Sequence, residues 1–220
     1  MIPQAAGYSL KDSMKITFLR HGRSRADDEN VIEGRYDSPL TAAGIQQAEL
    51  LAAYWRENNP GFDHAECSTL SRARQTAEIV CDALGLIPTP VEEWMEFDNT
   101  PIAGMTHEAA QQKYPIPAFR HRYQKFTPDG GESEDAFRRR AATALEQVFQ
   151  SGAENALVVA HGGVLNMALR ALVGCPDHVI FPFGDTAFTV VEVSRNSERV
   201  VLRAVAQQPH LAAHPELLNF

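Results

Sequence analysis

The sequence contains little cysteine and no long hydrophobic run. Its 220 residues include three cysteines, Cys67, Cys81 and Cys175, and no two of them have Cys-x-x-Cys spacing. This excludes a disulfide framework and a cysteine zinc site, so we expect the three cysteines to act as small buried apolar residues. No apolar run approaches the roughly 18 residues that span a bilayer. Residues 1–15 lack a basic flank followed by an apolar stretch, so we expect no secretory signal, no membrane partner and a cytoplasmic location.

Positive charge is also scarce. The chain has 20 Lys and Arg residues against 28 Asp and Glu residues, a formal net charge of −8 at pH 7. This balance argues against nucleic acid or a membrane surface as the usual partner. Any anion that the protein binds must therefore be held by a local cluster of positive groups.

Strand-like and helix-like segments alternate along the chain. The strand-like runs are residues 15–19, 62–67, 156–160, 187–193 and 199–206, with the last two placed to form a hairpin. The helix-like segments are 42–58 after Thr41, 71–84 before Gly85, a segment from Ser133 to about residue 150, and 164–173 before Gly174. This order predicts an α/β three-layer sandwich with a mostly parallel central sheet and helices on both faces.

The pattern divides the chain into a single domain with two flanking segments. We expect an N-terminal extension over residues 1–13, a domain over 14–206 and a C-terminal tail over 207–220. Residues 88–131 are irregular and rich in proline, aromatic and charged residues, which is typical of a functional lid or insertion. His210 and His214 have helical i, i+4 spacing, but prolines bracket them in the tail, so we expect no metal site there.

Two histidines follow apolar strands and precede glycine. His21 ends the run Leu19-Arg20-His21-Gly22, and His161 ends Val159-Ala160-His161-Gly162. Ligands of open α/β sheets bind outside the carboxyl ends of the strands, so both imidazoles are expected at one crevice. The glycines let backbone N–H groups approach an oxyanion, and the helix after His161 adds its positive end. A single histidine in this context is more often structural, whereas two favour a site.

The sequence around these histidines resembles the histidine phosphatase superfamily, which has the phosphoglycerate-mutase-like fold. The resemblance lies in four blocks that occur in the family's order: Arg20-His21-Gly22-Arg23-Ser24 with Gly34, Asp37, Pro39-Leu40-Thr41, Gly44 and Gln47-Ala48; Ser68 to Ala77; Gly131-Glu132-Ser133 with Arg140; and His161-Gly162-Gly163. These blocks extend over most of residues 15–195.

The resemblance implies a role for each of the basic residues. His21 matches the nucleophile and would form a phosphohistidine, for which one ring nitrogen must be unprotonated. Arg20 and Arg72 match the guanidinium groups that clamp the phosphate, with His161 and Gly162 at the same anion. The family's chemistry needs no cofactor and no metal. These residues would be the local positive cluster that the net charge requires.

The resemblance also implies a proton donor for the leaving oxygen. The family places a glutamate eight residues before a glycine, and here Glu96 lies eight residues before Gly104. Three residues of the surrounding stretch depart from the family pattern, namely Thr100, Ile102 and Ala103. Glu92 and Glu93 are nearby alternatives, and all three glutamates are also compatible with a solvated acidic loop.

The first loop departs from the family pattern at three positions. Arg23 stands where the family usually has Glu, Asp27 where it has Asn, and Glu33 where it has Gln; together with Ser24 and Gly34 these are candidate substrate-binding residues. Two added carboxylates would repel a phosphate dianion. One hypothesis is a charge swap in which Arg23 pairs with Asp27, and this is the one that we favour. The other is that the carboxylates select a cationic or hydroxyl-rich leaving group.

The segment from Phe119 to Lys125 is basic and aromatic. Without a wider basic field it does not predict nucleic-acid binding. It is compatible with a lid over the substrate and, equally, with a solvated insertion.

The sequence therefore predicts a metal-independent phosphomonoester hydrolase that acts through phosphohistidine on a small phosphorylated metabolite, as a monomer or homodimer. A phosphoglycerate mutase is the alternative within the family, but residues 98–102 replace the block that similar mutases carry after the acid residue. A non-catalytic phosphate-binding protein of the same fold is the third hypothesis, although such proteins usually lose the nucleophile or a clamp.

Overall fold

The computed structural model describes residues 13–115, 128–194 and 199–218. Its core is one six-stranded sheet with the strand order β3-β2-β4-β1-β5-β6. The strands are β1 (Ser13–Arg20), β2 (His64–Ser68), β3 (Thr89–Val91), β4 (Asn155–Ala160), β5 (Phe188–Ser194) and β6 (Val200–Gln207). Only β5 runs against its neighbours, so the sheet is mostly parallel as predicted.

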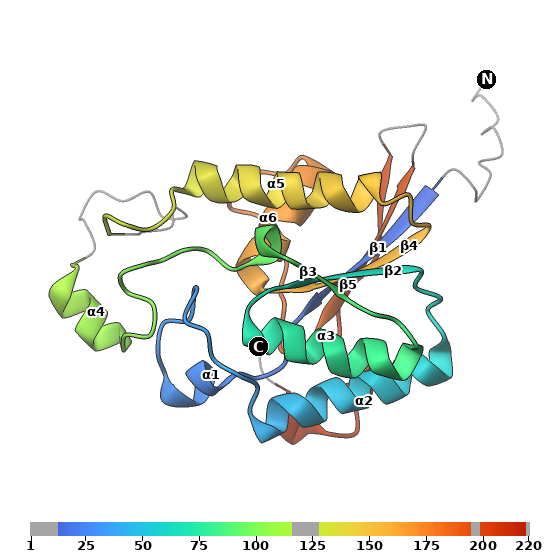
Figure 1. The fold of residues 1–220 in the computed structure, drawn as a ribbon, viewed down its shortest axis with the longest axis horizontal. Helices are drawn as coiled ribbons and strands as arrows, with labels where there is room; N and C mark the ends of the chain where they lie inside the picture. Colours follow the sequence, from blue (N-terminus) through green and yellow to red (C-terminus); the bar gives the residue numbers. More distant parts are fainter. Residues whose placement is uncertain (1–12, 116–127, 195–198, 219–220) are drawn as a thin grey trace.

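Two pairs of helices cover the two faces of this sheet, which confirms the three-layer prediction (Figure 1). The helices α2 (Ala42–Asn58) and α3 (Ser71–Leu84) lie on one face, and α5 (Glu134–Gln150) and α6 (Gly162–Val173) on the other. Side chains of one strand alternate between the layers: Ile16 and Phe18 pack toward α5 and α6, and Leu19 packs toward α2 and α3. Cys67 on β2 and Cys81 on α3 are buried in the same apolar cluster, as expected for small apolar residues.

The helix boundaries follow from the capping residues that the sequence offers. Thr41 accepts a hydrogen bond from the Gly44 N–H at 3.1 Å, and Ser133 accepts one from the Ala136 N–H at 3.1 Å. Gly85 ends α3 in the left-handed conformation at φ 70°. Residues 42–58 and 71–84 are therefore the helices predicted. The hairpin prediction is also confirmed, because β5 and β6 pair antiparallel.

Residues 88–131 contain more regular structure than the sequence indicates. They hold the edge strand β3, the 3₁₀ turn η2 (Glu92–Trp94) and the helix α4 (His107–Lys113). Strand β3 has only three residues and includes Pro90, which an edge strand tolerates, so its sequence gave no strand signal. The five-residue helix α1 (Arg25–Glu29) is also too short to be read from periodicity.

The C-terminal residues pack on the domain. Two 3₁₀ turns, η3 (Pro209–Leu211) and η4 (Pro215–Leu217), lie against α2, and Leu211 is completely buried. The side-chain amide of Gln47 on α2 donates to the Leu217 carbonyl at 2.7 Å. The segment predicted as a tail therefore contributes to the core.

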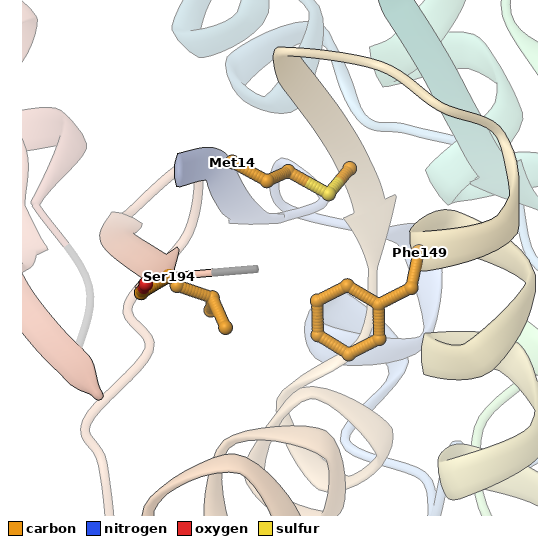
Figure 2. A pocket seen from close by; sticks show the side chains of 4 residues that line it. Met14, Phe149 and Ser194 are labelled. Atoms are coloured by element: carbon orange, nitrogen blue, oxygen red, sulfur yellow. The ribbon is translucent and has the colours of Figure 1, made fainter. Parts of the chain in front are cut away.

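A cavity of about 310 Å³ lies where β1 begins and where α5 and β5 end (Figure 2). Among the described residues its lining consists of Met14, Phe149, Val193 and Ser194, none of which carries a charge. The two motif histidines lie at the opposite end of the sheet. Among the described residues, no helix is both long and apolar enough to cross a membrane.

Candidate active site

His21 and His161 meet at the carboxyl ends of two neighbouring parallel strands. Strands β1 and β4 pair so that Arg20 lies opposite Ala160, the last residue of each strand. The backbone N–H of His21 continues this pairing by donating to the Ala160 carbonyl at 3.0 Å. The two ring centroids lie 5.0 Å apart with an interplanar angle of 58°, and both side chains are buried. The structure thus brings together the two histidines that the strand pattern predicts at one crevice.

Hydrogen bonds select one tautomer of His21. The Nδ1 atom lies 2.7 Å from the Gly22 carbonyl oxygen, which can only accept, so Nδ1 carries the proton. The Nε atom of Arg72 donates to Nε2 of His21 at 3.2 Å, so Nε2 holds a lone pair. Burial, together with the charges of Arg72 and Arg20, lowers the pKa of His21 well below its ordinary value. His21 is therefore neutral near pH 7, with an unprotonated Nε2.

His161 is fixed by Ser68, which lies in the second of the four motif blocks. Its Nε2 lies 2.8 Å from the hydroxyl oxygen of Ser68, at the end of β2. Its Nδ1 is buried without a hydrogen-bond partner in the described part of the chain. Burial lowers the pKa of His161 well below its usual range, with the Arg72 charge next in effect. His161 is thus a neutral imidazole beside His21, and its Nδ1 makes no hydrogen bond within the described residues.

Arg72 is held rigidly in the first turn of α3. Its side chain is completely buried. One guanidinium nitrogen donates to the Tyr36 carbonyl at 3.0 Å and another to the Gly34 carbonyl at 2.9 Å. The remaining nitrogen, Nε, faces His21 and also lies 3.3 Å from a carboxylate oxygen of Glu33. The planar guanidinium of Arg72 therefore holds a fixed positive charge next to His21.

Arg20 is positioned by a loop that sequence reasoning did not single out. The Arg20 guanidinium donates to the Phe183 carbonyl at 2.9 Å and lies 3.4 Å from the buried carboxylate of Asp185. The neighbouring Thr186 donates its backbone N–H to the His21 carbonyl at 3.2 Å, and it has a positive φ of 53°. The sequence offers no local signal for this loop, since a β-branched residue rarely adopts this conformation.

The C-terminal segment supports the same loop. Nε2 of His210 lies 2.8 Å from the Thr186 hydroxyl, and the Gln208 amide donates to the Asp185 carbonyl at 2.8 Å. The Thr186 hydroxyl itself donates to the Asp185 carbonyl at 2.7 Å, so Nε2 of His210 is the donor in the first contact. Burial lowers the pKa of His210 to about 4. His214 is directed elsewhere and pairs with Glu216.

Glu96 lies against the first turn of α6, next to His161. One carboxylate oxygen accepts the Gly163 N–H at 2.7 Å, and the other accepts its neighbour's N–H, that of Phe97, also at 2.7 Å. A Cβ atom on Gly163 would collide with this carboxylate, which explains the glycine at that position. Gly162 is the first residue of α6 and directly follows His161. Glu92 is exposed. Of Glu92, Glu93 and Glu96, Glu96 is the one whose carboxylate accepts a hydrogen bond from a residue of the motif blocks.

Arg140 holds the segment that carries Glu96. Its guanidinium donates to the carbonyls of Glu93, Met95 and Glu96 at 2.6–3.1 Å. It also pairs with the Glu132 carboxylate at 2.5 Å. The family resemblance marks Arg140 as structural, and the structure shows which backbone it fixes.

The first loop overturns one predicted ion pair. Arg23 pairs with Asp28 at 2.7 Å, and this contact raises the pKa of Arg23. The Asp27 carboxylate instead accepts the Ser24 backbone N–H at 2.7 Å. The predicted pairing of Arg23 with Asp27 is therefore wrong, because Asp27 is the third residue of α1 and closes a capping box at its start.

Glu33 lies inside the candidate phosphate pocket. One of its carboxylate oxygens accepts the Ser24 hydroxyl at 2.5 Å, and the other lies 4.0 Å from Nε2 of His21. Gly34 follows with a φ of 49°, and a Cβ atom there would collide with the Asn99 side chain. The basic segment 119–125 lies outside the described residues. Among those that are described, no group of three or more His, Cys, Asp or Glu side chains is arranged to hold a metal ion.

Comparison with known proteins agrees with this geometry. The family model of the histidine phosphatase superfamily (branch 1) matches residues 16–206. A Yersinia pestis protein named "Probable phosphoglycerate mutase GpmB" is 33% identical over 171 residues, covering 75% of this chain and 77% of its own. The α-ribazole phosphatase of Shigella flexneri is 26% identical with a TM-score of 0.78, covering 89% of this chain and 97% of its own. Bacillus stearothermophilus YhfR is 28% identical with a TM-score of 0.79, covering 90% and 99%.

Proposed function

The chain belongs to the histidine phosphatase superfamily, and from this membership and the geometry of its site we propose that it hydrolyses the phosphomonoester of a small metabolite through a phosphohistidine intermediate. The observation that carries the proposal is the state of His21. Its Nε2 carries a lone pair and accepts a hydrogen bond from the Arg72 guanidinium, while its Nδ1 proton is fixed by a carbonyl oxygen. Such a nitrogen is a ready nucleophile for phosphorus.

In the first step, Nε2 of His21 forms a bond to phosphorus as the bond from phosphorus to the ester oxygen breaks. The negative charge on the transferring group spreads over three oxygens, so its stabilisation is the main catalytic task. Arg72 and Arg20 supply fixed positive charge, and the unpartnered Nδ1 of His161 is available to donate a hydrogen bond. Because these charges are built into the protein, we propose that the reaction needs no metal ion.

Glu96 is the group that we assign to proton transfer. As an acid it gives its proton to the departing ester oxygen, and as a carboxylate it then takes a proton from water. The water oxygen attacks phosphorus, the bond to Nε2 breaks, and inorganic phosphate leaves. Arg140 fixes the backbone of this segment through three carbonyl groups, so the carboxyl group returns to one position in both steps.

The names of the relatives leave one competing activity. The Yersinia protein bears the name of a phosphoglycerate mutase, whereas the Shigella structure is of a phosphatase that acts on α-ribazole phosphate. A mutase must keep its phosphohistidine from water until the product binds. Residues 98–102 differ from the block that similar mutases carry after the acid residue, which favours hydrolysis in this chain.

The test is turnover in the presence of a chelator. The wild-type protein should release inorganic phosphate from p-nitrophenyl phosphate in EDTA, and His21→Ala should abolish the release. A radiolabelled ester should leave an acid-labile label on His21, and the exposed His107→Ala variant should behave as wild type. Isomerisation of 3-phosphoglycerate without phosphate release would establish the mutase instead, and loss of turnover in EDTA would refute metal independence.

A further inference from the structure

Glu33 is a carboxylate placed where the phosphate must bind. One of its oxygens lies 3.3 Å from Nε of Arg72, the same atom that donates to Nε2 of His21. Its other oxygen lies 4.0 Å from Nε2 itself. A phosphoryl group attached to Nε2 therefore brings its own oxygens within reach of this carboxylate. The Glu33 carboxylate and an unprotonated phosphoryl oxygen repel each other when they are in contact, whereas one proton between them makes a strong charge-assisted hydrogen bond.

Glu33 is not free to move out of the way. The Ser24 hydroxyl donates to its carboxylate at 2.5 Å, and Ser24 is completely buried. The next residue, Gly34, is fixed by the Arg72 guanidinium at its carbonyl, and the Asn99 side chain occupies the space that a Cβ atom on Gly34 would take. Turning the carboxylate away would break the Ser24 contact and leave a buried hydroxyl without its acceptor.

The surrounding groups leave Glu33 and the phosphate as the partners that share the proton. Several charged and titratable groups act on this cluster. They are Arg72 from α3, Arg20 and His21 at the end of β1, His161 before α6, Asp27 from α1, Asp37 from the loop before α2, Glu96 from the segment after η2, Arg140 from α5, and Asp185, which pairs with Arg20. The pKa values of His21 and His161 are both lowered, mainly by burial, so these rings stay neutral over the range in which phosphate esters titrate. The arginines remain charged.

We propose that this site binds the phosphate group together with one proton, held between Glu33 and a phosphoryl oxygen, so that Glu33 makes the enzyme select the singly protonated phosphate. The inference rests on the proposed function for the identity of the ligand, and it adds a specificity residue to that site. It also replaces the repulsion expected from a glutamate in the phosphate pocket with a defined role. Phosphate binding therefore requires one proton, which a glutamine at this position would not require.

Proton uptake tests this directly. Isothermal titration of the wild-type protein with inorganic phosphate at pH 8, in two buffers of different ionisation enthalpy, should report about one proton taken up per phosphate bound. Glu33→Gln should take up about none, since its amide donates a hydrogen bond to the dianion. Glu29→Gln, an exposed α1 residue paired with Arg25, is the matched control and should behave as wild type. Thermal melting of each variant verifies that it is folded.

The pH profile gives a second readout. For the wild-type protein, the dissociation constant of phosphate should rise about tenfold per pH unit above the second pKa of the ligand, because one proton is bound with it. The Glu33→Gln constant should stay flat, and its kcat/KM should persist to higher pH. Equal proton uptake by both proteins would overturn the role of Glu33 while leaving the hydrolase intact. Failure of both proteins to bind phosphate at any pH would overturn the inference and the proposed function together.

Discussion

The candidate site has two parts that are built in different ways. The imidazoles of His21 and His161 and the guanidinium of Arg72 belong to strand ends or a helix, and each of these side chains is at most 1% exposed. The carboxylates of Glu33 and Glu96 lie on connecting segments and depend on Ser24 and Arg140 for their positions. The side chains that we propose to bind phosphate thus lie on strand ends and a helix, whereas the carboxylates that we propose to hold or transfer protons lie on loops.

The difference predicts the largest loss for a change in the rigid part. Arg72→Lys keeps the charge but has one nitrogen where the arginine uses three, so it cannot hold both carbonyls and also face His21. We expect kcat/KM for p-nitrophenyl phosphate to fall about 10³-fold, as for removal of an oxyanion donor. Steady-state kinetics at saturating and limiting substrate would measure this loss.

Arg74→Lys is the matched control because it makes the same change two residues along α3. Arg74 is exposed and pairs with Glu78 at 3.5 Å, so this variant should keep wild-type kinetics. Similar losses in both variants would show that the change disturbs α3 and not the phosphate clamp.

A smaller loss is expected in the loop-borne part. Glu96→Gln keeps the shape of the side chain but removes the proton that the leaving oxygen needs. We expect kcat for an alkyl phosphate to fall about 100-fold, and kcat for p-nitrophenyl phosphate to fall much less, because nitrophenolate leaves without protonation. The ratio of the two rates is the measurement.

Glu92→Gln serves as the control, since Glu92 is exposed in the same segment. It should leave both rates unchanged. If Glu96→Gln lowered the two rates equally, the carboxyl group would be acting on the structure of the α6 terminus, and the proton donor would lie elsewhere.

The same division explains what the sequence could predict. The strands that end in His21 and His161 are apolar runs, and their parallel pairing follows from the alternation of strands and helices, so the meeting of the two rings was predictable. Arg72 and Glu96 came from the family pattern, and their contacts agree with it in the structure. The signal was strong for His21, Arg72 and His161 and weaker for Glu96, because Thr100, Ile102 and Ala103 depart from the family pattern around it.

The interactions that were missed depend either on local helix capping or on contacts between segments far apart in the chain. Arg23 could have paired with either of two neighbouring aspartates, and the choice of Asp28 was decided by the capping of α1. The support of Arg20 by Asp185, and of Thr186 by His210, depends on how the C-terminal residues fold back across α2. No periodic pattern encodes such contacts, because they are set by packing.

His210 gives the smallest of the expected effects, and it acts on stability. The pKa of His210 is lowered by burial to about 4, against about 6.5 in an unfolded chain. Between these two values the unfolded chain binds a proton that the folded protein does not, so the free energy of unfolding decreases as the pH falls from 6.5 to 4. At pH 5 the loss due to this residue should be roughly 2 kcal/mol.

His210→Gln removes the titrating group, so the two proteins should change order with pH. At pH 7 the variant should be less stable by about 1 kcal/mol, the value of a hydrogen bond such as that to Thr186. Below about pH 6 it should become the more stable protein, since it no longer carries the penalty of a buried neutral histidine. Urea unfolding from pH 5 to pH 7 measures both free energies, and His214→Gln, at a partly exposed position in the same C-terminal segment, should follow the wild type throughout. Parallel curves for the wild type and His210→Gln would mean that His210 can be protonated in the folded protein, and that the C-terminal segment does not seal the loop behind Arg20.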